Sequence, residues 1–159
     1  MLEDVDSCYS IMNTPVGIIT LVCRREKLIE LNFGEKHPAS MQRDHSLITE
    51  PWMQEIQQYF EGKRKNFDLP FEINGTEFEC RVWKTLCLIP YGETCSYKKV
   101  AECVGNFRGF RAVGMANSKN KIPIIIPCHR VISSDGTLGG YSGGLQIKRW
   151  LLNLESENK

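Results

Sequence analysis

The sequence changes its hydrophobic pattern between residues 62 and 75, and this change constrains the fold more than any other feature. Before it, apolar residues form three short runs at 8–12, 18–23 and 28–33, and the segments 13–17 and 24–27 between them are rich in turn-forming or charged residues. Short runs of this kind, bounded by turns, are typical of antiparallel strands. We therefore expect a small three-stranded meander at the start of the chain.

A helix is predicted after the strands. Thr49 and Pro51 suit a helix start, and Gly62 suits its end. Between them apolar residues recur at i, i+4, i+7 and i+8, at Trp52, Ile56, Tyr59 and Phe60. This spacing gives one apolar helix face that can cover the sheet, and the segment 63–74 is then a polar connector.

The second half of the chain is predicted to be mainly helical. Thr76 and Glu79 form a capping box before an apolar stripe that ends at Pro90, made of Phe78, Val82, Leu86 and Ile89. Two short helices follow, at about 96–104 with Gly105 as terminator and at about 109–119. Two short helices joined by a tight link suggest a helix-turn-helix. The second of them has small side chains, which would allow close approach to a partner or tight packing in a core.

The last predicted helix carries an apolar stripe at i, i+3, i+4 and i+7, formed by Ile147, Trp150, Leu151 and Leu154. Glu155 follows this stripe and could turn inward, although solvation is the more common fate of such a residue. The pattern as a whole predicts an α+β protein. We expect an N-terminal domain over residues 1–74 and a C-terminal domain over residues 75–159 that holds the helix-turn-helix.

Charge is distributed unevenly along the chain. The net charge is +1, yet residues 80–149 carry 11 Lys or Arg against three acids, a net of +8, so the remaining residues carry −7. A basic segment beside an acidic body suggests a polyanionic partner bound in one orientation, although uneven charge on a solvated surface gives the same sum.

Composition excludes several classes of protein. No apolar stretch reaches the length of about 18 residues that a membrane helix needs, and the first six residues are acidic where a signal peptide is basic. We expect an intracellular protein, cytoplasmic or, in a eukaryote, nuclear. Seven cysteines are scattered without a C-x-x-C pair, so neither a disulfide framework nor a zinc cluster is indicated.

One cysteine stands out because of its neighbours. The β-branched run 124–126 predicts a buried strand that is interrupted at Pro127, and Cys128 follows at an expected opening. His129 and Arg130 are adjacent, and cationic neighbours lower the pKa of a thiol. The alternative is a buried structural cysteine beside a hydrogen-bonded histidine.

A glycine-rich loop follows the cysteine. Four of the six residues 139–144 are glycine, and Tyr141 and Ser142 lie among them. Such a loop permits close approach to a flat ligand, but it lacks the lysine and the spacing of a phosphate-binding loop.

Several motifs together match one family. They are Val82-Trp83, Ile89-Pro90-Tyr91-Gly92-Glu93-Thr94, Ser96-Tyr97, Arg111-Ala112-Val113-Gly114, Asn120, the run 124–132 and Gly140-Tyr141-Ser142-Gly143-Gly144-Leu145. In these the chain resembles the O6-alkylguanine-DNA alkyltransferases, densely over residues 76–155 and more weakly at 14–17. The resemblance implies a ribonuclease-H-like N-terminal domain and direct-reversal repair, in which an alkyl group passes irreversibly from O6-alkylguanine in DNA to the protein.

The resemblance also implies catalytic roles. Cys128 would be the nucleophile, His129 its base through a bridging water, and Glu155 the group that orients His129. Tyr141 would give a proton to the departing guanine. No cofactor and no metal is implied.

Substrate-binding roles follow from the same resemblance. Ser142 would contact O6, Pro123 would pack on the alkyl group, and the backbone carbonyls of Cys128 and Val131 would bind the amino group of the base. Asn120 would tie the helix-turn-helix to the active-site strand, and Tyr97 would crowd the phosphate 3′ to the target nucleotide.

The implied partner is double-stranded DNA that contains O6-alkylguanine, bound through the minor groove by a monomer, with no membrane involved. Because a base inside a duplex cannot reach a buried thiol, it must be rotated out. Arg111 would enter the base stack, and further DNA contacts would come from Tyr97, Ala112, Gly114, Arg130, Lys98 and Lys99. Phe110 and Lys121 depart from the family pattern, which commonly has a small residue and a proline there.

Alternative functions remain at this stage. A cysteine hydrolase could use Cys128, His129 and Glu155, but it would need an oxyanion hole and would leave the helix-turn-helix unexplained. A non-catalytic lesion-binding protein would lack the nucleophile. A structural zinc site would have to use Cys8, Cys23, His37 or His45, whose spacing is poor for zinc.

Overall fold

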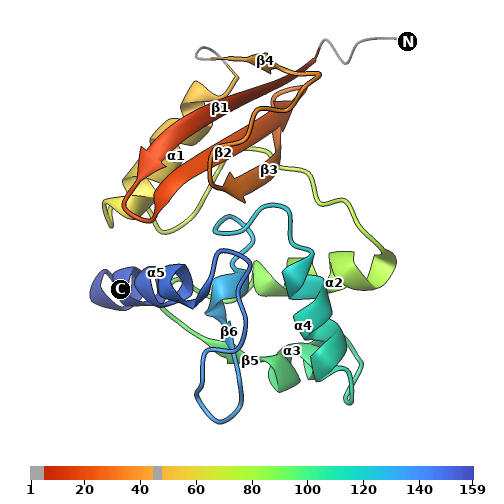
Figure 1. The fold of residues 1–159 in the computed structure, drawn as a ribbon. Coiled ribbons are helices and arrows are strands. Elements are labelled where there is room, and N and C mark those ends of the chain that lie inside the picture. Colours follow the sequence, from red (N-terminus) through yellow and green to blue (C-terminus); the bar gives the residue numbers. More distant parts are fainter. Residues whose placement is uncertain (1–5, 45–47) are drawn as a thin grey trace. The chain divides into compact units, whose positions relative to one another are not determined.

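A computed structural model describes residues 6–44 and 48–159 of the chain. The protein has an α+β fold that divides into two compact units, Met1–Glu72 and Ile73–Lys159 (Figure 1). Among the described residues, the strands of the larger sheet lie in the first unit and four of the five α-helices in the second, which matches the predicted fold class.

The sheet of the first unit has the strand order β3-β2-β1-β4. The three predicted strands are present as β1 (Ser7–Thr14), β2 (Gly17–Arg24) and β3 (Lys27–Phe33), and they pair antiparallel. A fourth strand, β4 (Gln42–Arg43), pairs parallel with β1, so the expectation of a purely antiparallel meander was incomplete. Two residues are too few to show an alternating pattern in the sequence.

Helix α1 (Glu50–Phe60) supplies the predicted apolar face, with Trp52, Ile56 and Tyr59 buried in the first unit. Its start differs in detail from the usual cap. Thr49 makes no side-chain capping hydrogen bond; its hydroxyl lies 2.6 Å from the hydroxyl of Ser10 on β1 and donates to the carbonyl of Asp44 at 3.1 Å. The residue therefore ties the helix start to the sheet.

The second unit is built on α2 (Glu77–Leu86), α3 (Tyr97–Cys103) and α4 (Phe110–Ser118). The capping box of α2 is confirmed: the Thr76 hydroxyl accepts from the Glu79 amide, and the Glu79 carboxylate accepts from the Thr76 amide. Helices α3 and α4 pack together as the predicted helix-turn-helix (Figure 1). The indole of Trp83 donates to the carbonyl of Ala116 at 2.9 Å, which fixes the end of α4 to α2.

The prediction that Cys128 follows a buried strand is wrong. Residues 122–127 are buried but irregular, and Cys128–Arg130 forms one turn of 3₁₀ helix; extended structure begins only at β6 (Val131–Ile132), which pairs with β5 (Cys95–Ser96). Ile124 has φ = 75°, a conformation that breaks any strand. The Asn120 side chain stabilises the bend, because it accepts from the Ile122 amide at 3.0 Å and donates to the Ile126 carbonyl at 2.9 Å.

The last helix, α5 (Leu145–Glu157), fully buries only Leu151 of the predicted apolar stripe, and Glu155 turns inward as the sequence allowed. Its buried residues are Lys148, Leu151 and Glu155, at i, i+3 and i+7, whereas Ile147, Trp150 and Leu154 are half-buried. Two of the three buried side chains are charged, so an apolar pattern could not identify this face. Within residues 6–44 and 48–159, no helix is long and apolar enough to cross a membrane.

Candidate active site

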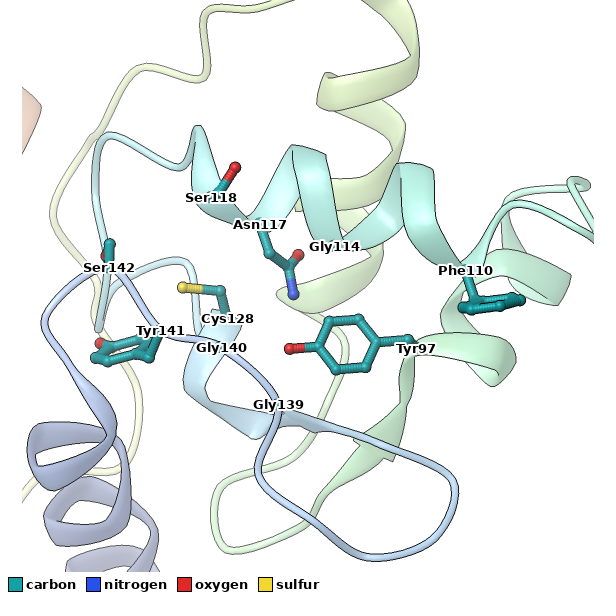
Figure 2. A pocket seen from close by; sticks show the side chains of 10 residues that line it. All are labelled: Tyr97, Phe110, Gly114, Asn117, Ser118, Cys128, Gly139, Gly140, Tyr141 and Ser142. Carbon is teal, nitrogen blue, oxygen red and sulfur yellow. The ribbon is translucent and has the colours of Figure 1, made fainter.

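Cys128 lies at the first position of the 3₁₀ turn and borders a cavity of about 430 Å³ in the second unit. Its side chain is only 3% exposed. The cavity is lined from α3 and α4 by Tyr97, Phe110, Gly114, Asn117 and Ser118, and from the glycine-rich loop by Gly139, Gly140, Tyr141 and Ser142. Figure 2 shows the thiol beside Tyr141 and Ser142, with the Tyr97 hydroxyl directed to the middle of the group.

Tyr97 forms a wall of this cavity by packing on the glycine-rich loop. Gly139 has φ = 71°, and a Cβ at this position would lie 2.7 Å from the Tyr97 hydroxyl. Only glycine accepts both the backbone conformation and the contact. Burial raises the pKa of Tyr97, so its hydroxyl stays protonated. Tyr97, predicted to meet a DNA phosphate, is thus half-buried beside Cys128.

His129 and Glu155 form a buried pair next to the thiol. The Nε2 atom of His129 lies 2.7 Å from Oε1 of Glu155, and the side chains are 0% and 1% exposed. Burial lowers the pKa of His129, although the hydrogen bond and charge of Glu155 oppose this. Burial raises the pKa of Glu155, but hydrogen bonds from His129 and Arg130 outweigh it and bring the pKa to about 2. A neutral imidazole that donates from Nε2 to this carboxylate keeps its lone pair on Nδ1.

Arg130, which was predicted to contact DNA, completes this buried group, and its burial does not support that role. Its guanidinium donates to both oxygens of Glu155, at 2.8 Å from Nε and 2.9 Å from Nη2, and to the carbonyl of Ile89 at 2.7 Å. The residue is 7% exposed. The bidentate geometry positions the Glu155 carboxylate against His129.

The prediction that cationic neighbours lower the pKa of Cys128 is wrong. Burial raises it to about 11, and the hydrogen bond from Asn120 and the charge of Lys148 reduce this effect only in part. The two neighbours that suggested an acidic thiol do not supply a positive charge to it: Arg130 is paired with Glu155, and His129 is held neutral. At neutral pH the thiol is therefore protonated and needs a base before it can react.

Lys148 is a residue of this site that the sequence did not reveal. Its ammonium group is fully buried and donates to the carbonyls of Val131 at 2.7 Å, Gly140 at 3.1 Å and Leu138. Through these bonds α5 holds the strand after Cys128 to the glycine-rich loop. Burial lowers the pKa of Lys148 to about 8. A lysine one position from an apolar stripe gives no sequence signal for such a role.

Tyr141 and Ser142 are the two residues of the glycine-rich loop for which the resemblance implied contacts with the guanine. Both line the cavity with Cys128 (Figure 2). Burial raises the pKa of Tyr141 well above its ordinary value, so its phenol is a proton donor across the physiological range. Ser142 is exposed at the edge of the cavity.

Three other predicted substrate-binding residues are buried outside the cavity lining. Asn120 binds the backbone of the bend that precedes Cys128. Pro123, predicted to pack on the alkyl group, is buried in that bend and is not among the residues that line the cavity. The carbonyl of Val131, predicted to bind the base, accepts from Lys148.

Three of the cations predicted to contact DNA are exposed on the helix-turn-helix. Lys98 and Lys99 are exposed at the start of α3, and Arg111 is exposed at the start of α4. Ala112 and Gly114 are half-buried, and Gly114 lines the cavity. Because Arg130 and Lys148 are buried, the basic segment presents fewer charges to a partner than its sequence suggests.

The cysteines of the first unit do not form a recognisable metal site. Cys8 and Cys23 are free cysteines that lie opposite each other on the neighbouring strands β1 and β2. Burial raises their pKa values to about 11 and about 12. His37 lies near the hydroxyl of Tyr9 and the carboxylate of Glu35, while His45 is outside the described residues. The part of the chain that the structure describes contains no group of three or more His, Cys, Asp or Glu that could hold a metal ion.

A cavity that contains a nucleophile and is bordered by a helix-turn-helix with exposed cations is typical of proteins that carry out chemistry on one base of a nucleic acid. Comparison with known proteins shows which of these proteins the chain resembles. Residues 8–73 match the family domain described as "6-O-methylguanine DNA methyltransferase, ribonuclease-like domain", and residues 77–157 match "6-O-methylguanine DNA methyltransferase, DNA binding domain".

Full-length relatives agree with the two domain matches. The chain is 47% identical to a methylated-DNA–protein-cysteine methyltransferase of Methanosarcina barkeri, over 94% of this chain and 98% of that protein. An inducible enzyme of the same name from Bacillus subtilis is 42% identical, over 92% and 83%. The crystal structure of Mycobacterium tuberculosis OGT in complex with DNA superposes with a TM-score of 0.89 at 39% identity, over 95% and 94% of the chains.

The chain belongs to the 6-O-methylguanine DNA methyltransferase family, and its activity is direct-reversal DNA repair by alkyl transfer. This assignment overturns the cysteine hydrolase alternative.

Proposed function

We propose that Cys128 is the alkyl acceptor and that O6-alkylguanine in DNA is the donor. The observation that carries this proposal is the position of the thiol on a cavity of about 430 Å³ between Tyr97 of the helix-turn-helix and Tyr141 of the glycine-rich loop. Cavities of this size are within the range that holds small flat ligands. The presence of Cys128 also argues against a non-catalytic lesion-binding protein.

Proton transfer has to precede the attack, because burial holds the pKa of Cys128 at about 11. His129 donates from Nε2 to the ionised Glu155, so its Nδ1 atom takes the thiol proton through a bridging water. The thiolate then attacks the alkyl carbon, a C–S bond forms and the bond to O6 breaks. Tyr141 gives its phenolic proton to the departing guanine, and Ser142 contacts O6. Arg130 is a positioning residue that holds Glu155.

DNA reaches this site with the alkylated base rotated out of the duplex. The solved relative in complex with DNA supports DNA as the partner. We propose that a monomer binds the minor groove through α4, that Arg111 enters the base stack, and that Lys98 and Lys99 contact phosphates. Small residues at Ala112 and Gly114 suit close approach of a helix to this groove.

The reaction is proposed to consume the protein, one alkyl group per chain. The thioether formed at Cys128 has no carbonyl for water to attack and no good leaving group. Cys128 lies in a bend without a second cysteine beside it, and no cofactor is implied by the residues that line the cavity. Product should therefore stop at one equivalent.

Mass spectrometry of the protein after incubation with O6-methylguanine duplex DNA tests the proposal. We expect one adduct of about 14 Da, mapped to Cys128, and a plateau at one equivalent with DNA in excess. Cys128→Ala should bind the same DNA without any adduct, and Cys103→Ala, which changes an exposed cysteine, should react like the wild type. An adduct that persists in Cys128→Ala, or product that accumulates beyond several equivalents, would refute it.

A further inference from the structure

Phe110 is an aromatic residue in an unusual position for a helix-turn-helix. It is the first residue of α4, its side chain is 50% exposed, and it lines the cavity that contains Cys128. Figure 2 shows it at the end of the lining farthest from the thiol, with Tyr97 between the two. Phe110 therefore borders the cavity away from the thiol, where it can meet the DNA that carries the bound base.

Phe110 also contacts the residue proposed to enter the base stack. The Arg111 guanidinium carbon lies 5.9 Å from the centroid of the Phe110 ring, a cation–π distance, and both side chains are exposed. Along α4, Phe110, Gly114 and Asn117 face the cavity at i, i+4 and i+7. The ring thus lies between the cavity and the cation.

The same ring borders a second cavity of about 370 Å³, with Tyr97, Lys98, Ser133, Ser134 and Asp135 in its lining. Phe110 therefore lines both cavities, and half of the residue is still exposed to solvent. Such a projecting ring is suited to contact a flat apolar surface at the entrance of the first cavity.

A rotated-out base leaves a gap in the duplex, and the bases next to the gap lose a stacking partner. Apolar side chains that enter a base step replace this lost contact, and an aromatic ring does so regardless of the neighbouring base. Arg111 alone supplies a charged plane. Phe110 beside it supplies an uncharged aromatic face on the cavity side.

We propose that Phe110 and Arg111 act as a two-residue wedge, in which the Phe110 ring stacks on the nucleobase next to the extruded alkylguanine and stabilises the extruded state. This inference rests on the proposed function. It makes Phe110 a positioning residue for duplex DNA, without a role in the bond changes at Cys128.

Transfer rates on two substrates test the wedge: a duplex with O6-methylguanine and the free base O6-methylguanine. For Phe110→Ala we expect a loss of about tenfold or more on the duplex, from the loss of one base-stacking contact, and a free-base rate within about twofold of wild type. Phe110→Trp should keep the duplex rate, and Phe110→Leu, which is apolar without a ring, should behave like Phe110→Ala.

Phe107→Ala is the matched control, because Phe107 is 73% exposed in the link before α4 and lies outside both cavity linings. It should leave both rates unchanged. A second readout is the fluorescence of 2-aminopurine placed next to the lesion, measured in the Cys128→Ala background, where adding Phe110→Ala should change the signal of the complex.

The wedge is overturned if Phe110→Ala reduces both rates equally, which would make the ring a cavity wall. It is also overturned if the duplex rate rises, which would make the ring an obstacle, or if it does not change. Failure of the wild type to transfer a methyl group to Cys128 from either substrate would instead refute the proposed function.

Discussion

Replacing Glu155 with Gln should remove a pH-dependent part of the stability of the second unit. The Glu155 carboxylate is 1% exposed and accepts hydrogen bonds from His129 and from two nitrogens of Arg130. Gln has nearly the same shape but no charge, so the change leaves the Arg130 guanidinium buried without its counter-ion.

The pKa of Glu155 gives the magnitude. Burial opposes ionisation, but the hydrogen bonds of His129 and Arg130 lower the pKa from the ordinary 4.5 to about 2. The difference of about 2.5, at about 1.36 kcal/mol for each pKa unit, corresponds to about 3 kcal/mol of unfolding free energy. This value agrees with the cost of about 3–5 kcal/mol that is typical when one partner of a buried ion pair is removed.

The sign follows from which state binds more protons. The folded pKa is the lower one, so the contribution of Glu155 is complete above pH 4.5 and is lost as the pH falls toward about 2. At pH 7 the variant should be about 3 kcal/mol less stable than wild type, and this difference should shrink steadily below pH 4.5. His129 is present in both proteins, so its titration contributes to both curves.

Urea unfolding at a series of pH values measures the effect. The indole NMR signals of Trp83 and Trp150 monitor the unfolding, because both residues lie in the second unit. Glu157→Gln is the control, because Glu157 is exposed on the same helix, and it should change stability by less than about 0.5 kcal/mol at any pH. A Glu155→Gln difference below about 1 kcal/mol at pH 7, or one that stays constant down to pH 3, would refute the reasoning.

Three further predictions concern the cavity. Gly139→Ala should displace the Tyr97 ring and destabilise the protein by about 1–2 kcal/mol, because residue 139 has a positive φ. Gly140→Ala should have a mild effect, because the space around a Cβ at this position is open. Equal effects of the two variants in thermal unfolding and in transfer assays would contradict this prediction. Lys148→Met should cost at least about 2 kcal/mol, because three carbonyls lose a charged donor, and a neutral result in urea unfolding would show that water replaces the ammonium. The thiolate absorbance that differs between wild type and Cys128→Ser should appear only above about pH 10, and a midpoint near the reference value of about 8.5 would show that the thiol is not desolvated.

Elements with local signals were predictable from the sequence. The capping box at Thr76 and Glu79, the helix end at Gly105 and the three strands of the first unit all depend on residues close in sequence, and the structure has each of them. Helix spacing likewise placed Trp52 and Ile56 in the core.

The segment before Cys128 shows where such reasoning fails. Three consecutive isoleucines favour a strand, but Asn120 bonds the backbone on both sides of Ile124, and Ile124 takes a positive φ. The hydrogen bond from the Asn120 side chain to the Ile126 carbonyl, six residues further along the chain, outweighs the local preference for extended structure. The burial of the isoleucines was predictable and their conformation was not.

Charged residues of the site were the hardest to interpret. Arg130 and Lys148 add to a basic segment in sequence, yet both are buried, and their partners lie between 8 and 41 positions away. The family resemblance identified Glu155 as a partner of His129, but the bond of Arg130 to the same carboxylate depends on tertiary structure. Lys148 had no signal at all.

The burial of Cys128 has a consequence for the proposed reaction, in which each chain accepts one alkyl group. With a pKa of about 11, the thiol is ionised in roughly one molecule in ten thousand at pH 7, and its exposed fraction is 3%. Stray oxidants and small alkylating agents in the surroundings meet exposed thiols such as Cys103 far more readily. Burial of the thiol thus protects the proposed acceptor from side reactions before a damaged base occupies the cavity.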